Sequence, residues 1–212
     1  MYTSNLQHLF LLLPTAVWGA AVRLAARDNP ASLPHITSVQ YSGDGCPSSA
    51  PAVDKSGGFD DASFRLNAFA VSRADAYSAT ANCEVHVQAS GASSGWQVGV
   101  SDVYVRGRLV LDPGAQMDFY VMTFWSQSAA NTVTVRGSLE NTGGARSDQI
   151  ATAHGSIPGD RVAWGPCTGS SGDIGILNVN FRTALQGSGY GSFGGKGGDS
   201  AVESWDYVWR RC

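Results

Sequence analysis

Hydrophobic and polar side chains alternate with a period of two over several stretches of this chain. The clearest stretch covers residues 83–89, where apolar residues occupy every second position and polar residues stand between them. Residues 64–70 and 133–139 follow the same rule. Successive side chains of a strand point to opposite faces, so each stretch predicts a β-strand with one buried face and one face toward solvent.

Residues 117–125 are apolar at almost every position and predict a central strand covered on both sides. Gly- and Pro-rich turn sequences separate the predicted strands, and no stretch has convincing helical periodicity. The sequence therefore predicts an all-β, single-domain antiparallel β-sandwich, jelly-roll-like in its connections. The turn sequences lie at residues 42–45, 56–58, 90–91, 112–114, 141–144, 158–160 and 165–166.

The N-terminus carries an apolar run too short to span a membrane, and we interpret residues 1–20 as a cleaved signal peptide. Lys and Arg are absent before that run, which leaves an uncleaved anchor as the alternative. Residues 21–34 predict a flexible or processed segment, and residues 35–212 the secreted domain. No later stretch is long and apolar enough for a membrane span.

The composition narrows the choice of partners. Charged residues make up 15% of the chain, Gly accounts for 26 of 212 residues, and the formal net charge is -3. Because no basic patch is available for phosphate groups, we expect no nucleic-acid partner.

Four cysteines, Cys46, Cys83, Cys167 and Cys212, fit a disulfide-stapled protein of an oxidising compartment. They can pair in three ways, and the sequence alone does not choose among them. Chain order favours Cys46 with Cys83 and Cys167 with Cys212. No Cys-x-x-Cys spacing points to zinc or redox chemistry.

Motifs for catalysis are weak. The Gly-x-Gly-x-x-Gly string at residues 189–194 runs into more glycines instead of opening a helix. His35, His86 and His154 lie on separate segments without metal-ligand spacing, so we assign no catalytic residue, metal or cofactor. Carboxylates could still supply the pair that a glycosidase needs. The candidates are Asp44, Asp60, Asp61, Asp102, Asp118, Asp173, Glu84, Glu140 and Glu203.

Aromatic residues offer a binding hypothesis. Trp205, Tyr207 and Trp209 are spaced to share one strand face, where flat rings could stack on sugars, and Trp96 and Tyr190 could add to them. The alternative is core packing beside the Cys212 bridge, which is the commoner environment of such rings.

Several motifs together resemble a known family. They are the stretch from His35 through Gly43-Asp44-Gly45-Cys46-Pro47, the pairs Asn82-Cys83 and Gly95-Trp96, and the segments 104–107 and 111–114. The chain is similar to a small secreted family, common in filamentous fungi and present in some bacteria, that is known only as a domain of unknown function. The resemblance implies secretion, an all-β fold and the Cys46–Cys83 bridge, and it supplies no active site.

Three functions remain in competition. The first is a secreted, non-catalytic protein that binds cell-wall or host polysaccharide through aromatic residues. The second is a structural wall component or secreted effector that acts by protein contacts. The third is a carboxylate-dependent extracellular hydrolase.

Overall fold

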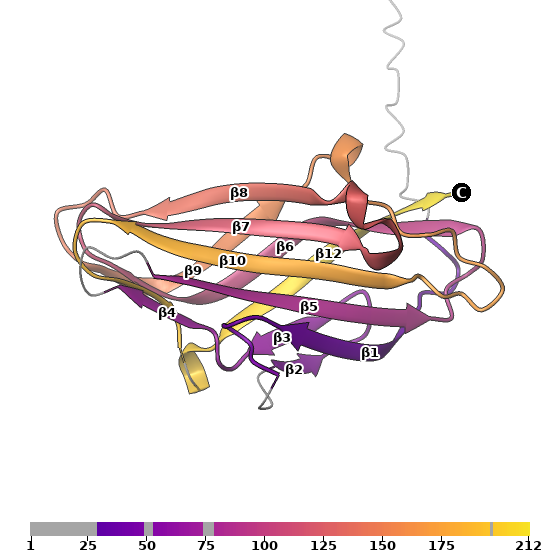
Figure 1. Cartoon of the computed structure of the whole chain (residues 1–212), viewed down its shortest axis with the longest axis horizontal. Coiled ribbons are helices and arrows are strands. Elements are labelled where there is room, and N and C mark those ends of the chain that lie inside the picture. Colours follow the sequence, from indigo (N-terminus) through magenta and orange to yellow (C-terminus); the bar gives the residue numbers. More distant parts are fainter. Residues whose placement is uncertain (1–28, 49–52, 74–78, 196) are drawn as a thin grey trace, which may run out of the picture.

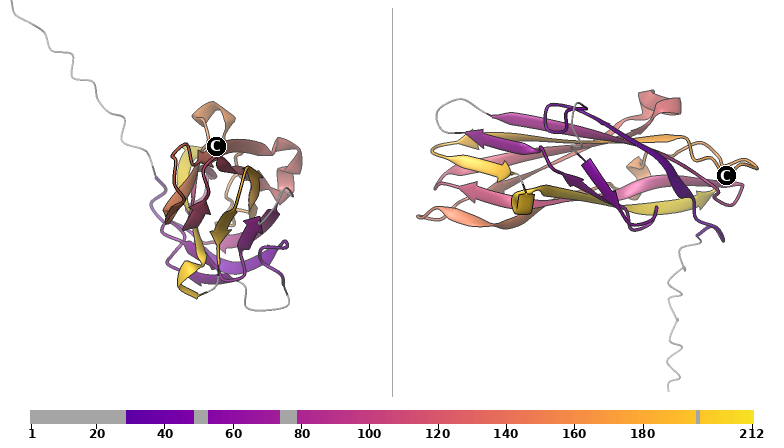
Figure 2. Two further views of the ribbon diagram at one scale, coloured as in Figure 1. Left: turned by 90° about the vertical axis from the view of Figure 1, so that its left-hand side faces the viewer. Right: turned by 90° about the horizontal axis from the view of Figure 1, so that it is seen from below.

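The protein is a sandwich of two antiparallel sheets, seen in a computed structural model (Figures 1 and 2). We describe residues 29–48, 53–73, 79–195 and 197–212. The predicted signal peptide and residues 21–28 lie outside this described part. The antiparallel all-β sandwich that the alternation predicted is confirmed. No helix in the described part is long and apolar enough to cross a membrane.

The five-stranded sheet lies in front in Figure 1 and has the order β1-β5-β10-β7-β8. Long, fully paired neighbours make it a continuous surface, since β10 pairs with β7 over eleven residues and with β5 over nine. Its strands are β1 (His35–Ser42), β5 (Thr80–Ser90), β7 (Ala115–Trp125), β8 (Val133–Glu140) and β10 (Ile176–Gly187).

The seven-stranded sheet has the order β2-β3-β12-β6-β11-β4, and β9 pairs with the other side of β6. Three short 3₁₀ turns complete the described part: η1 (Ser126–Asn131), η2 (Gly159–Arg161) and η3 (Gly197–Asp199). The strands are β2 (Val53–Ser56), β3 (Ser63–Leu66), β4 (Ala70–Arg73), β6 (Trp96–Leu111), β9 (Ser147–Ser156), β11 (Gly191–Gly194) and β12 (Ala201–Arg211).

The core lies between the sheets and follows the predicted alternation. On β5 every second side chain from Ala81 to Ala89 is buried, and the inward residues of β8 are half-buried as expected. A cluster of phenylalanines joins the layers: the Phe181 ring lies 5.5 Å from that of Phe69 and 6.2 Å from that of Phe193.

Residues 64–70 do not form the single strand that the alternation predicted. Strand β3 ends at Leu66, and a turn closed by the Phe69 amide bonding to the Leu66 carbonyl leads into β4. The turn shifts the phase, so that Phe69 is fully buried and Ala70 is exposed. The prediction failed because the apolar character of a Phe buried in a turn does not distinguish it from a buried residue of a strand.

Residues 117–125 do form the predicted central strand, since β7 pairs with β10 on one side and β8 on the other. The prediction that both faces are covered is wrong. Only one face is buried in the core, whereas Tyr120, Met122 and Phe124 lie half-buried on the outer face of the sheet. The apolar residues on the second face of β7 therefore belong to the outer surface of the sheet, which carries aromatic side chains.

Both disulfides have the pairing that chain order favoured. Cys46–Cys83 joins the turn after β1 to β5, with 5.3 Å between Cα atoms. Cys167–Cys212 ties the C-terminus to the loop before β10, with 6.0 Å between Cα atoms.

Two glycines at equivalent points of Val-Arg-Gly segments make room for aromatic rings. A Cβ on Gly137 would lie 2.4 Å from the Phe119 ring, and one on Gly107 would lie 2.9 Å from the Phe193 ring. Neither glycine lies at a register irregularity in the ladders. Both glycines therefore have the same role, which is to let a ring from a neighbouring strand pack over the backbone.

One carboxyl group lies inside the core. Glu203 on β12 is fully buried; its Oε1 accepts a hydrogen bond of 2.6 Å from Trp205 Nε1, and its Oε2 has no partner in the described part. The buried Tyr207 hydroxyl also lacks a partner there. Burial raises the pKa of Glu203 to about 8, because the charged form loses its hydration, and only the Trp205 hydrogen bond opposes this.

We predict that Gly137→Ala destabilises the fold by about 1–3 kcal/mol, because a methyl group overpacks the Phe119 ring. Urea denaturation measures the change. Gly144→Ala is the matched control, since nothing lies within 4 Å of a Cβ placed there. Equal stability of the two variants would show that the ring moves aside freely.

We predict that Glu203→Gln removes a pH dependence of stability. The folded-state pKa of about 8 exceeds the ordinary value of 4.5, so the parent is most stable below pH 4.5 and loses stability as the pH rises toward 8. Each pH unit in that window costs about 1.4 kcal/mol if the shift is complete. The Gln variant keeps an acceptor for Trp205 and should be the more stable protein at pH 9.

Urea denaturation at pH 5, 7 and 9 measures this effect. Glu140→Gln, a change at an exposed glutamate of β8, controls for the loss of one charge. A parent stability that stays flat or rises between pH 5 and 9 would contradict the assignment.

Candidate functional site

The aromatic residues singled out by sequence do not form one exposed platform. Trp96 and Trp205 are each 2% exposed. The Phe64 ring packs 4.6 Å from Trp205, and the Arg211 guanidinium lies 4.0 Å from the ring centre of Trp96. Neither indole offers an open face in this conformation.

Tyr207, Trp209 and Tyr190 are only partly buried, but each ring has a neighbour. Tyr207 stacks on Phe59 at 4.3 Å, and Trp209 lies 6.1 Å from that same ring. Tyr190, far along the chain, lies beneath Arg146 at 5.2 Å. The ligand-binding role of the five aromatics stays a prediction.

A register irregularity explains why the expected spacing failed. Strand β12 shifts against β6 between Asp206 and Tyr207. Buried and more exposed side chains alternate along β12 up to Trp205. The alternation then ends, and Tyr207, Val208 and Trp209 are all half-buried. Such a bulge breaks the i, i+2, i+4 rule, and the residue pattern alone does not announce it.

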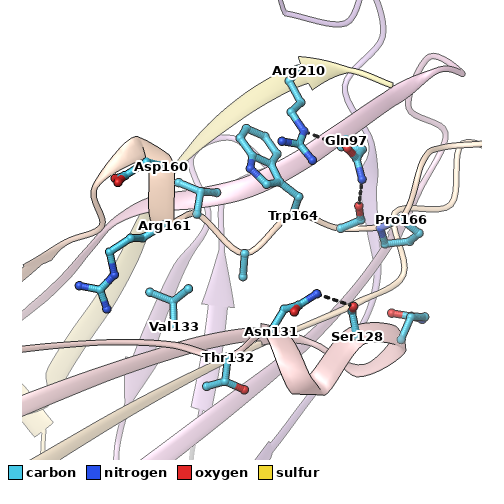
Figure 3. A pocket seen from close by; sticks show the side chains of 14 residues that line it. Gln97, Ser128, Asn131, Thr132, Val133, Asp160, Arg161, Trp164, Pro166 and Arg210 are labelled. Atoms are coloured by element: carbon cyan, nitrogen blue, oxygen red, sulfur yellow. Dashed lines mark hydrogen bonds between the residues drawn. The ribbon is translucent and has the colours of Figure 1, made fainter.

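The hollows of the surface lie elsewhere, around η1. The largest hollow among those identified in the described part has a volume of about 540 Å³ and opens between η1, the start of β8 and the loop that contains η2 (Figure 3). Trp164 stands at its upper side, half-buried. The Arg210 guanidinium lies 4.2 Å from the Trp164 ring centre and donates to Gln97 Oε1 at 2.9 Å.

Two smaller hollows continue from the first one. One of about 220 Å³ shares Gln127 with the largest hollow, and one of about 280 Å³ shares Gln88 and Ile176 with the 220 Å³ hollow. We call these three together the η1 band. It passes from the sandwich edge onto the outer face of β1, β5 and β10.

Amide and hydroxyl side chains dominate the lining of the η1 band. Gln88 is exposed, and its amide makes no hydrogen bond within the described part of the chain, so it is available to a ligand. Charged groups are few, with Asp160, Arg161 and Arg210 in the largest hollow and Asp173 in the smallest. The amides are Gln40, Gln88, Gln97, Gln127, Asn131 and Asn178.

The register of the sheet brings these polar groups together. Gln40 on β1 is opposite His86 on β5, and His86 is opposite Asn178 on β10. Asn178 is only 3% exposed although it points away from the core. Sequence analysis missed it, yet the pattern Asn178-Val179-Asn180 inside an apolar strand is the signal that could have found it.

Hydrogen bonds fix the proton positions around His86. The Asn178 Nδ2 lies 3.3 Å from the Phe124 carbonyl oxygen, 3.2 Å from the Ile176 carbonyl oxygen and 2.9 Å from Ser126 Oγ. Carbonyl oxygens only accept, so this atom is the amide nitrogen and Asn178 Oδ1 faces His86 Nδ1 at 2.6 Å. His86 Nδ1 must then carry a proton.

The other ring nitrogen of His86 points to a hydroxyl. Ser42 Oγ lies 3.2 Å from His86 Nε2. In the neutral ring Nε2 is an acceptor, so the Ser42 hydroxyl donates to it. Glu84 Oε1 lies 3.5 Å from His86 Nδ1.

A second histidine pair lies on the opposite sheet. His154 Nε2 is 2.9 Å from Asp102 Oδ1, and the His154 ring stacks on Tyr104 at 4.5 Å. Burial acts to raise the pKa of Asp102, but hydrogen bonds from His154, Ser156 and Ser101 outweigh it and the pKa is lowered. The Ser101 hydroxyl donates to the Asp206 carbonyl oxygen at 3.3 Å.

The structure also places the candidate metal ligands and two of the candidate carboxylates. Within the described residues no three His, Cys, Asp or Glu side chains converge as metal ligands. Asp118 and Glu84 share the outer face of the five-stranded sheet, but neutral donors occupy both: Ser138 Oγ bonds to Asp118 at 2.8 Å, and Asn180 Nδ2 bonds to Glu84 at 2.9 Å.

The chain belongs to a family described as a domain of unknown function, DUF4360, whose model matches residues 33–212. No curated protein matches it. Among solved structures, TmCBM61 in complex with β-1,4-galactotriose is 11% identical, with a TM-score of 0.26 over 84% of this chain and 91% of that one. A structure of carbohydrate-binding modules from the β-sandwich superfamily is 10% identical, with a TM-score of 0.30 over 80% of this chain and 56% of that one. At such scores these likenesses carry no functional conclusion.

Proposed function

We propose that this member of the DUF4360 family is a secreted protein that binds polysaccharide in the η1 band. The observation that carries the proposal is the lining: six amides with serine and threonine hydroxyls, and few charges, along hollows that share walls. Amides and hydroxyls both donate and accept hydrogen bonds, which suits the hydroxyl groups of sugars.

The shape of the band favours a polymer over a small metabolite. Three neighbouring hollows that share Gln88, Ile176 and Gln127 offer successive positions along one path, whereas a small-molecule site is a single enclosed cavity. Trp164 adds an indole edge beside the amides of the largest hollow (Figure 3).

Two disulfides fit an oxidising, extracellular setting, where polysaccharides of walls are the abundant polymers. The alternative is a wall component or effector that acts by protein contacts, which needs a flat surface. The hollowed, amide-lined surface around η1 favours polysaccharide over that alternative.

We predict that the purified protein is depleted from solution by at least one of chitin, β-glucan and cellulose. Gln88→Ala should weaken this binding about 2- to 10-fold, the worth of one net hydrogen bond. Because the Gln88 side chain is exposed and its amide makes no hydrogen bond in the described part, truncating it to alanine should leave thermal stability unchanged.

Gln149→Ala is the matched control, since Gln149 is exposed on β9 of the other sheet. Retention by none of the three polysaccharides would overturn the proposal, and so would equal weakening by the two variants. Soluble sugar in the supernatant, measured in the same tubes, would instead favour the hydrolase alternative.

A further inference from the structure

Ser42, His86 and Asn178 form a linked chain of hydrogen bonds that runs from the η1 band to Ser42 beside it. Ser42 Oγ donates to His86 Nε2 at 3.2 Å, and His86 Nδ1 donates to Asn178 Oδ1 at 2.6 Å. A hydroxyl beside a neutral imidazole, with a third group that orients the ring, is the arrangement of an activated nucleophile. We infer that Ser42 is a nucleophile, with His86 as its general base, toward O-acyl esters on the bound polysaccharide.

The tautomer of His86 decides whether its Nε2 can act as a general base toward Ser42. Asn178 cannot turn its amide around, because two backbone carbonyls and Ser126 hold its nitrogen. The ring proton therefore stays on Nδ1, and Nε2 keeps the lone pair that a base needs. Asn178 is a positioning residue in this scheme.

Glu84 supplies charge at the same ring. Its Oε1 lies 3.5 Å from His86 Nδ1, close enough to stabilise the imidazolium that forms when Ser42 loses its proton. Asn180 Nδ2 holds the other carboxylate oxygen at 2.9 Å, which keeps Glu84 beside the ring.

Access and placement fit a substituent on a bound polymer. Ser42 is exposed at the end of edge strand β1. His86 and Asn178 line the 280 Å³ hollow of the η1 band, whereas Ser42 lies beside it. A chain held in that hollow would pass beside Ser42, within reach of its side substituents.

The turn after Ser42 offers amide donors for the developing oxyanion. Its hydrogen bonds come from the amides of Gly45, which bonds to the Asn82 carbonyl, and Cys46, which bonds to the Gly43 carbonyl. The amides of Gly43 and Asp44, which follow the nucleophile directly, take no part in these turn bonds. Amides in that position are the usual donors to an acyl-transfer oxyanion.

The reaction balances with water as the only co-reactant. Ser42 Oγ bonds to the acyl carbon, its proton passes to His86 Nε2, and the ester C–O bond breaks as that proton moves to the sugar oxygen. Water then attacks the acyl-serine, gives its proton to His86 and so back to Ser42 Oγ, and a carboxylic acid leaves.

Labelling with a fluorophosphonate probe tests the nucleophile directly. Mass spectrometry should locate the adduct on Ser42, and His86→Gln should slow the labelling about 100-fold or more, the contribution of a general base. Ser56→Ala is the matched control: Ser56 is an exposed serine on edge strand β2 of the other sheet and does not line the η1 band. It should label like the parent.

Labelling of Ser42 no faster than that of Ser56, or at a rate that His86→Gln leaves unchanged, would overturn the inference. The thermal unfolding midpoint of each variant is compared with that of the parent, so that a loss of labelling is not mistaken for a loss of folding. Release of acetate from acetylated xylan, absent in Ser42→Ala, checks the substrate class; labelling without such release would overturn the sugar-ester assignment.

The substrate class rests on the proposed polysaccharide binding, and the two can fail separately. Ser42→Ala should still be retained on the polysaccharide that retains the parent, because Ser42 does not line the η1 band. If the parent binds polysaccharide but is never labelled at Ser42, only the nucleophile inference is overturned and the proposed binding stands.

Discussion

The contact of phenylalanine rings between the two sheets is the interaction on which this structure depends. Phe181 of the five-stranded sheet packs against Phe193 of the other sheet, and Phe69 lies within 6.3 Å of both rings. Burying such rings drives the layers together and commits one face of every long strand to the core. The polar residues between them must then face outward, which places Gln40, Gln88 and Asn178 on the outer face of the five-stranded sheet.

The same constraint shows which parts of the fold could be predicted. Alternation identified β5, β8 and the sandwich because strand geometry enforces it. It failed at residues 64–70, where Phe69 fills the core from a turn, and after Trp205, where β12 shifts its register. Both failures arise from contacts between distant segments, which a local pattern does not contain.

The candidate site was harder to predict from the sequence than the fold was. Tryptophans drew attention to β12, but most of that strand's rings belong to the packing around Phe59 and Phe64. The η1 band joins residues from β1, β5, β10 and η1, which only the sheet register brings together. Its hint in the sequence was Asn178, a polar residue within the largely apolar strand β10.

Hydrogen–deuterium exchange with and without a bound, soluble β-glucan fragment tests the location of the site most directly. Binding in the η1 band predicts slower exchange at residues 36–42, 84–90, 126–133 and 174–178, because these segments line the hollows. Protection confined to residues 63–66 and 147–156, on the other sheet, would contradict the account.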